Sequence, residues 1–90
     1  MLSTLENLIR LARERKLVPQ EGSYTNKLLT DKSLTKAKVL EEVDELIEAV
    51  EKNSNKIHEA ADVLYHLLMY LEANDIKIED VMSELEKRKK

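Results

Sequence analysis

The sequence has no cysteine, and it contains one glycine, one proline and three tyrosines as its only aromatic residues. Without cysteine no disulfide framework can form, which agrees with a protein from a reducing compartment. So little glycine and proline in 90 residues favours continuous helices over a chain with many turns. We therefore expect a single small all-α domain over residues 1–90.

The chain also lacks a strong excess of either charge. Its 18 acidic and 15 basic residues are mixed along the sequence and give a net charge of −3. This balance offers no footprint for nucleic acid, and the basic cluster at residues 87–90 is typical of the end of a helix. No run approaches the roughly 20 apolar residues that cross a bilayer, and the amino terminus lacks the layout of a signal peptide. We expect a soluble, cytoplasmic protein with no nucleic-acid or membrane partner.

Helical periodicity covers most of the chain and predicts a small bundle of about four helices. Ser3 and Glu6 have the spacing of a capping box at the first helix, and Pro19 and Gly22 interrupt the pattern after it. Ser23 or Thr25 is expected to cap the chain segment after this interruption. The expected helices cover residues 4–16, 33–52, 55–73 and 79–90.

The predicted helices carry more apolar surface than one short chain can bury. The helix over 55–73 is apolar nearly all round, and a chain this short buries only about two thirds of its unfolded surface. The helix over 33–52 is expected to face the core with Val39, Val43, Leu46, Ile47 and Val50. We therefore expect a homodimer or higher homo-oligomer that completes the core.

Two pairs of acids stand three residues apart inside these helices, Glu42 with Glu45 and Glu59 with Asp62. Residues three apart lie on the same side of an α-helix, so each pair can point both carboxylates one way. If the two helices pack antiparallel, four carboxylates converge between them, as in bundle-core metal sites. Oxygen ligands, with no cysteine and no paired histidines, favour Mg²⁺, with Mn²⁺ as the alternative.

A purely structural interpretation stays open for these residues. Acids three apart are common on solvated helix faces, where they only keep a helix soluble. Glu59 and Asp62, however, share the remaining strip of a mostly apolar helix with His66, so part of this cluster should be poorly solvated and in need of a cation. His66 alone is better explained as a hydrogen-bonded structural histidine than as a metal ligand.

Together these residues resemble a specific family. The spacing of the two acidic pairs is similar to the signature of the MazG-like all-α nucleotide pyrophosphatases, and within them to phosphoribosyl-ATP pyrophosphatases. The resemblance runs from about Leu5 to Arg88, with Leu40 at a position where that family usually has glycine. The segments that carry it are Gly22–Thr25 with Lys27–Leu28, Lys38–Glu45, Glu59–Leu68 and Ile78–Val81.

The resemblance implies Mg²⁺-dependent hydrolysis of phosphoribosyl-ATP to phosphoribosyl-AMP and pyrophosphate, the second step of histidine biosynthesis. It implies a metal site of Glu42, Glu45, Glu59 and Asp62, with Glu42 and Glu45 in catalysis and Glu41 as a candidate to orient a ligand or accept a proton. The implied substrate-binding residues are Ser23, Tyr24, Thr25, Lys27, Lys38, Tyr65 and His66.

Two alternatives remain at this stage. One is a house-cleaning pyrophosphatase of the same superfamily, which would use the same acids on other nucleoside triphosphates. The other is a non-catalytic helical dimerisation module whose acids only solubilise it. These hypotheses differ in whether Mg²⁺ binds and in which triphosphate, if any, is hydrolysed.

Overall fold

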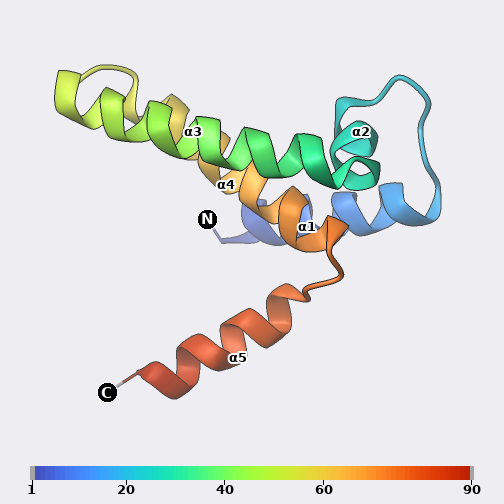
Figure 1. Cartoon of the computed structure of the whole chain (residues 1–90). Coiled ribbons are helices and arrows are strands. Elements are labelled where there is room, and N and C mark those ends of the chain that lie inside the picture. The colour runs from blue at the N-terminus through green and yellow to red at the C-terminus, as the bar shows by residue number, and fades with distance from the viewer. Residues whose placement is uncertain (1, 90) are drawn as a thin grey trace.

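The computed structural model describes residues 2–89, and every regular element among them is an α-helix. The predicted all-α class is therefore confirmed, with five helices in this part of the chain instead of about four (Figure 1). Three of the four expected helices agree with the structure to within one residue at each described end, and the last one ends at Arg88. The helices are α1 (Ser3–Leu17), α2 (Tyr24–Thr30), α3 (Lys32–Lys52), α4 (Lys56–Ala73) and α5 (Ile78–Arg88).

The capping box predicted at the start of α1 is wrong. Leu2 is the N-cap residue and no side chain caps the helix there, because Ser3 is already inside the first turn. Packing holds α1 in place instead, since Ile9 and Ala12 are buried in the core. The helix therefore depends on its apolar face more than on its first turn.

The helix α2 is the element that the periodicity did not predict. Gly22 turns the chain into it with φ of 80°, a backbone conformation that glycine adopts without strain. Ser23 then caps it by accepting a hydrogen bond from the backbone N–H of Asn26 at 3.3 Å. With only seven residues, α2 is too short to show a clear 3.6-residue period, yet Leu28 and Leu29 are buried.

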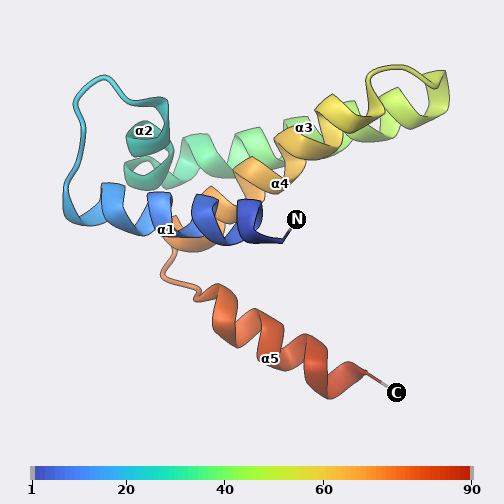
Figure 2. The same cartoon turned by 180° about the vertical axis from the view of Figure 1, so that it is seen from behind.

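The helices α3 and α4 form a long antiparallel hairpin, which the two opposite views show clearly (Figures 1 and 2). Asn53 and Asn55, on either side of its tip, both adopt left-handed backbone conformations with φ of 52° and 56°. Asparagine tolerates this conformation better than most residues, so the pair makes a tight reversal possible without glycine. The antiparallel packing that the metal-site prediction required is thus present.

The core-facing stripe predicted for α3 is wrong for three of its five residues, and the other two are half-buried. Val43, Ile47 and Val50 are exposed in the single chain, by 37%, 51% and 57%. The residues of α3 that are buried are Thr35, Glu42 and Ala49, at intervals of seven. Along this seam α3 presents small and polar residues to the rest of the chain, and three of its larger apolar residues face outward.

The core lies where α1, α2 and α4 meet, around the fully buried Leu28 and Met69. The helix α5 extends away from this core and buries none of its residues (Figure 1). It is tied to α1 by Arg13, which donates two hydrogen bonds to the Glu79 carboxylate at 2.8 and 2.5 Å. The chain turns between α4 and α5 at Asn74 and Asp75, where Asp75 has φ of 56°.

Among residues 2–89, no helix combines the length and the apolar character needed to cross a membrane.

Candidate metal and nucleotide site

Acidic side chains of α3 and α4 converge along the hairpin. On α3, Glu41, Glu42 and Glu45 can each offer an oxygen within 4.8 Å of the others. Burial raises the pKa of Glu59 on α4, and the nearby Glu45 carboxylate raises it further. Asp62 acts on Glu42 in the same direction by repulsion. The hairpin therefore brings together Glu42, Glu45, Glu59 and Asp62, the four acids predicted to form the metal site.

The cluster leaves two buried carboxylate oxygens without a partner. These are Oε2 of Glu42 and Oε2 of Glu59, which find no hydrogen-bond donor although they are shielded from solvent. Glu42 is only 6% exposed. Burial raises the pKa of Glu42 above its ordinary value of 4.5, and contact with Glu45 raises it further. The pKa of Glu59 is raised first by burial and then by Glu45.

These observations fit a divalent cation. A buried carboxylate oxygen without a donor is costly, and several carboxylates at close range repel one another unless a cation lies between them. Four side chains that offer only oxygen suit Mg²⁺ or Mn²⁺. The donor set and the unpartnered oxygens thus agree with the metal site expected from the sequence.

Lys38 stands at the edge of the cluster. Its ammonium lies 3.1 Å from Glu41 Oε2 and 4.0 Å from Glu42 Oε1, one turn before the acids on the same helix. The hydrogen bond from Lys38 to Glu41 raises the pKa of the lysine. The lysine stays cationic beside the acids and lies where it can meet an anionic ligand of the cluster.

A network of aromatic and polar side chains links α2 to α4, the helix that carries Glu59 and Asp62. The Tyr24 hydroxyl lies 2.9 Å from His66 Nε2, and His66 Nδ1 lies 2.8 Å from the backbone carbonyl of Asp62. Thr25 Oγ1 and the Tyr65 hydroxyl are 2.6 Å apart. His66 is buried with both ring nitrogens in hydrogen bonds within the chain. Since a carbonyl only accepts, Nδ1 is the donor to Asp62.

Of the residues predicted to bind substrate, Ser23 and Thr25 therefore already have partners in the chain. Ser23 Oγ accepts a hydrogen bond from Arg15 Nη1 at 2.8 Å in addition to the helix cap. Tyr24 differs, because it is 45% exposed beside its contact to His66. The ring of Tyr65 stacks on that of Tyr24 with centroids 6.4 Å apart.

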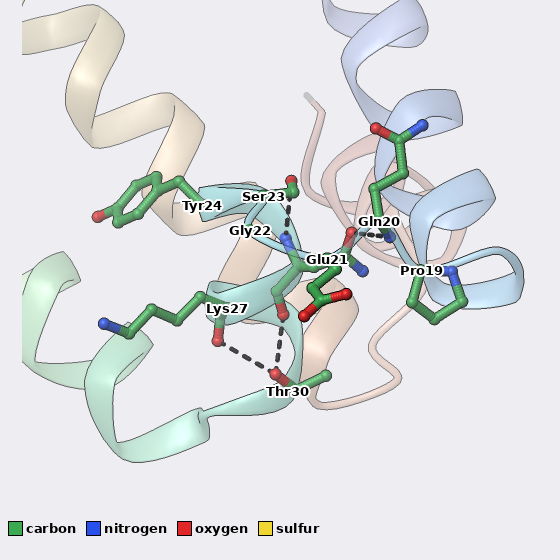
Figure 3. A pocket seen from close by; sticks show the side chains of 9 residues that line it. Pro19, Gln20, Glu21, Gly22, Ser23, Tyr24, Lys27 and Thr30 are labelled. Atoms are coloured by element: carbon green, nitrogen blue, oxygen red, sulfur yellow. Dashed lines mark hydrogen bonds between the residues drawn. The ribbon is translucent and has the colours of Figure 1, made fainter.

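A pocket of about 640 Å³ opens beside the loop between α1 and α2 (Figure 3). Lys27 and Tyr24 extend to the same side of α2 there, and the acids of the α3–α4 cluster are not part of the pocket's lining. Asn26 supports this loop, since its side chain accepts from the Gln20 N–H at 2.7 Å and donates to the Arg15 carbonyl at 2.9 Å. Tyr24 joins the pocket to the acid cluster through His66.

The sequence reasoning missed two residues of this region. His58 lies on the first turns of α4 with its Nε2 atom 3.3 Å from Asp62 Oδ2. Its spacing of four residues before Asp62 was a readable signal. Arg15 was missed because its role depends on the fold of the loop, which brings Ser23 back to α1.

The fold and the cluster define the class of protein, an all-α protein with a carboxylate centre suited to divalent cations between two antiparallel helices. Comparison with known proteins then identifies the family. A family model described as phosphoribosyl-ATP pyrophosphohydrolase matches residues 5–89. The chain belongs to this family, as the motifs predicted.

Curated relatives agree with this assignment. The chain is 45% identical to the phosphoribosyl-ATP pyrophosphatase of Listeria innocua, over 98% of the chain and 84% of that protein. It is 45% identical to the chloroplastic histidine biosynthesis bifunctional protein of Arabidopsis thaliana and 44% identical to the bifunctional protein of Pyrococcus furiosus. It spans only 33% and 43% of the length of these two. No solved structure matches the chain.

The family model and the name of the Listeria innocua relative agree with the predicted hydrolase class, and the two bifunctional relatives are named for histidine biosynthesis.

Proposed function

We propose that this chain hydrolyses phosphoribosyl-ATP to phosphoribosyl-AMP and pyrophosphate, the second step of histidine biosynthesis, in a reaction that depends on Mg²⁺. The observation that carries the proposal is the cluster of four carboxylates between α3 and α4 with two buried, unpartnered oxygens. Membership of the family supplies the substrate class. The cytoplasmic location expected from the sequence stays a prediction.

In this proposal Glu42, Glu45, Glu59 and Asp62 hold the metal, and Mn²⁺ is able to replace Mg²⁺. Bound Mg²⁺ supplies neutralisation of the negative charge on the phosphate oxygens while the anhydride is cleaved. The acids are held ready for this role by the packing of α3 against α4. Glu42 is the best positioned of them, because its burial keeps water from competing for its free oxygen.

The substrate is expected to bind with its phosphates towards the cations at the rim of the site. Lys38 is within 4.0 Å of Glu42 and would exchange its contact with Glu41 for a phosphate oxygen. Lys27 and Tyr24 line the neighbouring pocket, which is large enough for part of a nucleotide. Tyr65 and His66 support Tyr24 from α4, and Ser23 and Thr25 hold the start of α2 beside it.

Hydrolysis also requires a group that orients water and takes its proton. Glu41 is exposed next to the cluster, and its Oε2 atom already accepts a hydrogen bond from Lys38 at 3.1 Å. Departure of Lys38 towards a phosphate would free this carboxylate to accept a proton. Water adds across the anhydride between the α- and β-phosphates, so that one product is phosphoribosyl-AMP and the other is pyrophosphate.

Pyrophosphate release from phosphoribosyl-ATP tests the proposal directly. The assay runs beside ATP, dUTP and dCTP, first with Mg²⁺ and then with a chelator. We expect turnover of phosphoribosyl-ATP alone and none after chelation. Turnover of a free triphosphate instead would assign the chain to the house-cleaning pyrophosphatases, and no turnover of any substrate would favour the dimerisation module.

The carboxylate assignment is tested by Glu45→Gln, with Asp44→Asn as the matched control. Both replace a carboxylate by an amide of the same shape on the same helix, but Asp44 is exposed and lies outside the cluster. We expect Glu45→Gln to abolish turnover with the helical content unchanged, and Asp44→Asn to keep it. Full activity in Glu45→Gln would contradict the metal assignment.

We further propose that the enzyme is a homodimer whose two copies meet through the outer faces of α3 and α4. Val43, Ile47 and Val50 on α3 are exposed, and so are Leu64 and Leu67 on the packed helix α4, by 53% and 38%. Several exposed apolar side chains on two packed helices are typical of an interaction surface. A second copy supplies the same face, which is the requirement of a two-fold interface.

Light scattering on Ile47→Glu tests this interface. In light scattering coupled to size-exclusion chromatography, we expect the mass of a dimer for the wild type and of a monomer for Ile47→Glu, because the substitution places a charge inside the interface. Leu17→Glu is the control, since Leu17 is 84% exposed at the end of α1, outside the apolar face of α3 and α4. A dimeric Ile47→Glu, or a monomeric wild type, would contradict the proposal.

A further inference from the structure

Arg15 carries a positive charge that no acid of the described chain neutralises. Its Nη1 atom donates a hydrogen bond to Ser23 Oγ at 2.8 Å, and within residues 2–89 it forms no salt bridge. The residue is half-buried, so water solvates its charge only in part. A guanidinium has five N–H donors in a rigid fork, which leaves donors of Arg15 free for a ligand. A charge in this position favours binding of an anion.

The contact with Ser23 places Arg15 beside the pocket at the loop between α1 and α2. Ser23, Tyr24 and Lys27 all line this pocket of about 640 Å³ (Figure 3). Lys27 is exposed and, like Arg15, forms no salt bridge within the part of the chain that the structure describes. Of the residues that line the pocket, Glu21 alone is acidic, and it is exposed. The surroundings of the pocket are therefore cationic on balance.

This cationic pocket is separate from the acid cluster between α3 and α4, whose residues do not line it. Tyr24 connects the two places, because it lines the pocket and its hydroxyl lies 2.9 Å from His66 Nε2 on α4. The protein thus offers two regions to anionic groups. A cation bound by the acids, together with Lys38, serves one of them, and Arg15 with Lys27 serves the other.

Phosphoribosyl-ATP is a ligand with two anionic ends. Its triphosphate is attached to one ribose, and the phosphoribosyl group on the base carries a phosphate of its own. With the triphosphate at the metal cluster, the second phosphate must lie elsewhere. A nucleoside triphosphate without the phosphoribosyl group has no anion for this second position.

We propose that Arg15, together with Lys27, binds the 5′-phosphate of the phosphoribosyl group. The choice of this ligand rests on the proposed function. The guanidinium fork matches phosphate oxygens in two parallel hydrogen bonds, and Ser23 holds the fork at the pocket. Arg15 thereby favours phosphoribosyl-ATP over free triphosphates, which leave the half-buried guanidinium without a partner.

Ribose 5-phosphate is a probe for this position that needs neither metal nor turnover. It is titrated into the full chain in a chelator, and binding is followed by nuclear magnetic resonance. We expect Arg15→Gln to weaken binding by at least about tenfold, because a charge-assisted hydrogen bond is lost. Arg10→Gln is the matched control and should bind as the wild type does, since Arg10 is exposed on the same helix, donates to Asn7 and does not line the pocket. Equal affinity in Arg15→Gln and the wild type, or no binding by the wild type, would overturn the proposal.

The Nε–H resonance of Arg15 distinguishes contact with phosphate from mere support of Ser23. We expect this resonance to shift when ribose 5-phosphate is added and to stay in place when ribose is added. A resonance that responds to neither sugar would overturn direct binding by Arg15. Glu21→Gln should in turn strengthen binding, because it removes the one negative charge of the lining.

Steady-state kinetics on phosphoribosyl-ATP separates this inference from the proposed function. In Arg15→Gln we expect KM to rise about tenfold or more and kcat to change much less, because the acids of the metal cluster are untouched. Turnover of phosphoribosyl-ATP with the same KM in Arg15→Gln and the wild type would overturn the inference and leave the proposed function in place. A wild type that does not hydrolyse phosphoribosyl-ATP, but binds ribose 5-phosphate through Arg15, would reject the proposed function and support the sugar-phosphate site.

Discussion

Glu42→Gln should stabilise the metal-free protein, although it removes a residue proposed for function. The Glu42 carboxylate is 6% exposed, has one oxygen without a partner and lies beside the Glu45 carboxylate. A neutral amide of the same shape removes the repulsion and can donate a hydrogen bond to Glu45. Glutamine therefore fits the buried seam of α3 better than glutamate does when no cation is bound.

The size of the effect can be worked out from the spacing of the acids. Oxygens of Glu42 and Glu45 lie within 4.8 Å of one another. Two unit charges at that distance repel by about 0.9 kcal/mol in bulk water and by about 3.5 kcal/mol at the effective dielectric constant near a protein surface. We expect a gain of roughly 1 to 3 kcal/mol, and each 1 kcal/mol raises the Tm of a domain of this size by about 4–8 °C.

Thermal unfolding followed by circular dichroism, in buffer with a chelator, measures this gain. Glu48→Gln is the control, because Glu48 is an exposed acid of the same helix that is paired with Lys52, so its removal should lower the Tm slightly. Excess Mg²⁺ should then raise the Tm of the wild type and have little effect on Glu42→Gln. A Tm of Glu42→Gln equal to or below that of the wild type in the chelator would refute the reasoning.

Three further predictions concern the remaining ionisable groups and hydrogen bonds. Burial raises the pKa of Glu42 and Glu59 above 4.5, so near this pH the folded chain binds more protons than the unfolded chain. Without metal, the protein should therefore lose stability as the pH rises from about 4.5, and Mg²⁺ should restore that stability. Urea unfolding at several pH values, with a chelator and with Mg²⁺, measures this effect. The opposite sign applies to Glu79, whose pKa the Arg13 hydrogen bond lowers to about 2. Its contribution is complete above about pH 4.5 and disappears towards pH 2, so the Tm difference between wild type and Glu79→Gln should vanish over that interval. Tyr24→Phe removes the 2.9 Å contact to the buried His66 and should cost about 1 kcal/mol in urea unfolding, and an unchanged midpoint would show that this bond contributes nothing to stability.

The sequence predicted the parts of this molecule that depend on local periodicity. The hairpin of α3 and α4 and the convergence of its acids followed from helical spacing and a short connection. The helix α2 did not, since its seven residues are held by long-range contacts such as Asn26 to the Arg15 carbonyl. The capping box of α1 failed because the helix begins at Ser3 itself, with Leu2 as its N-cap, and packing determines its position.

The aromatic network was predicted only as a set of residues, because their roles depend on tertiary contacts. Nothing in the sequence around Tyr24 indicates that its hydroxyl meets a histidine 42 positions later. His58, in contrast, was accessible from the sequence, since it lies four residues before Asp62 on the same helix.

The helix α3 buries part of its acidic face and exposes part of its apolar face, and this orientation connects the proposed metal site with the proposed dimer. A single chain buries Glu42 along the α3 seam and leaves Val43, Ile47 and Val50 outside, so both faces of this helix are unfavourable when nothing else is bound. A cation offsets the cost on the inner face, and a second copy offsets the cost on the outer face. Both therefore stabilise the same hairpin. Mg²⁺ binding should in consequence strengthen dimerisation, and the dissociation constant of the dimer, measured by dilution with Mg²⁺ and with a chelator, should be smaller with Mg²⁺. Equal dissociation constants in the two buffers would show that the two faces of α3 act independently.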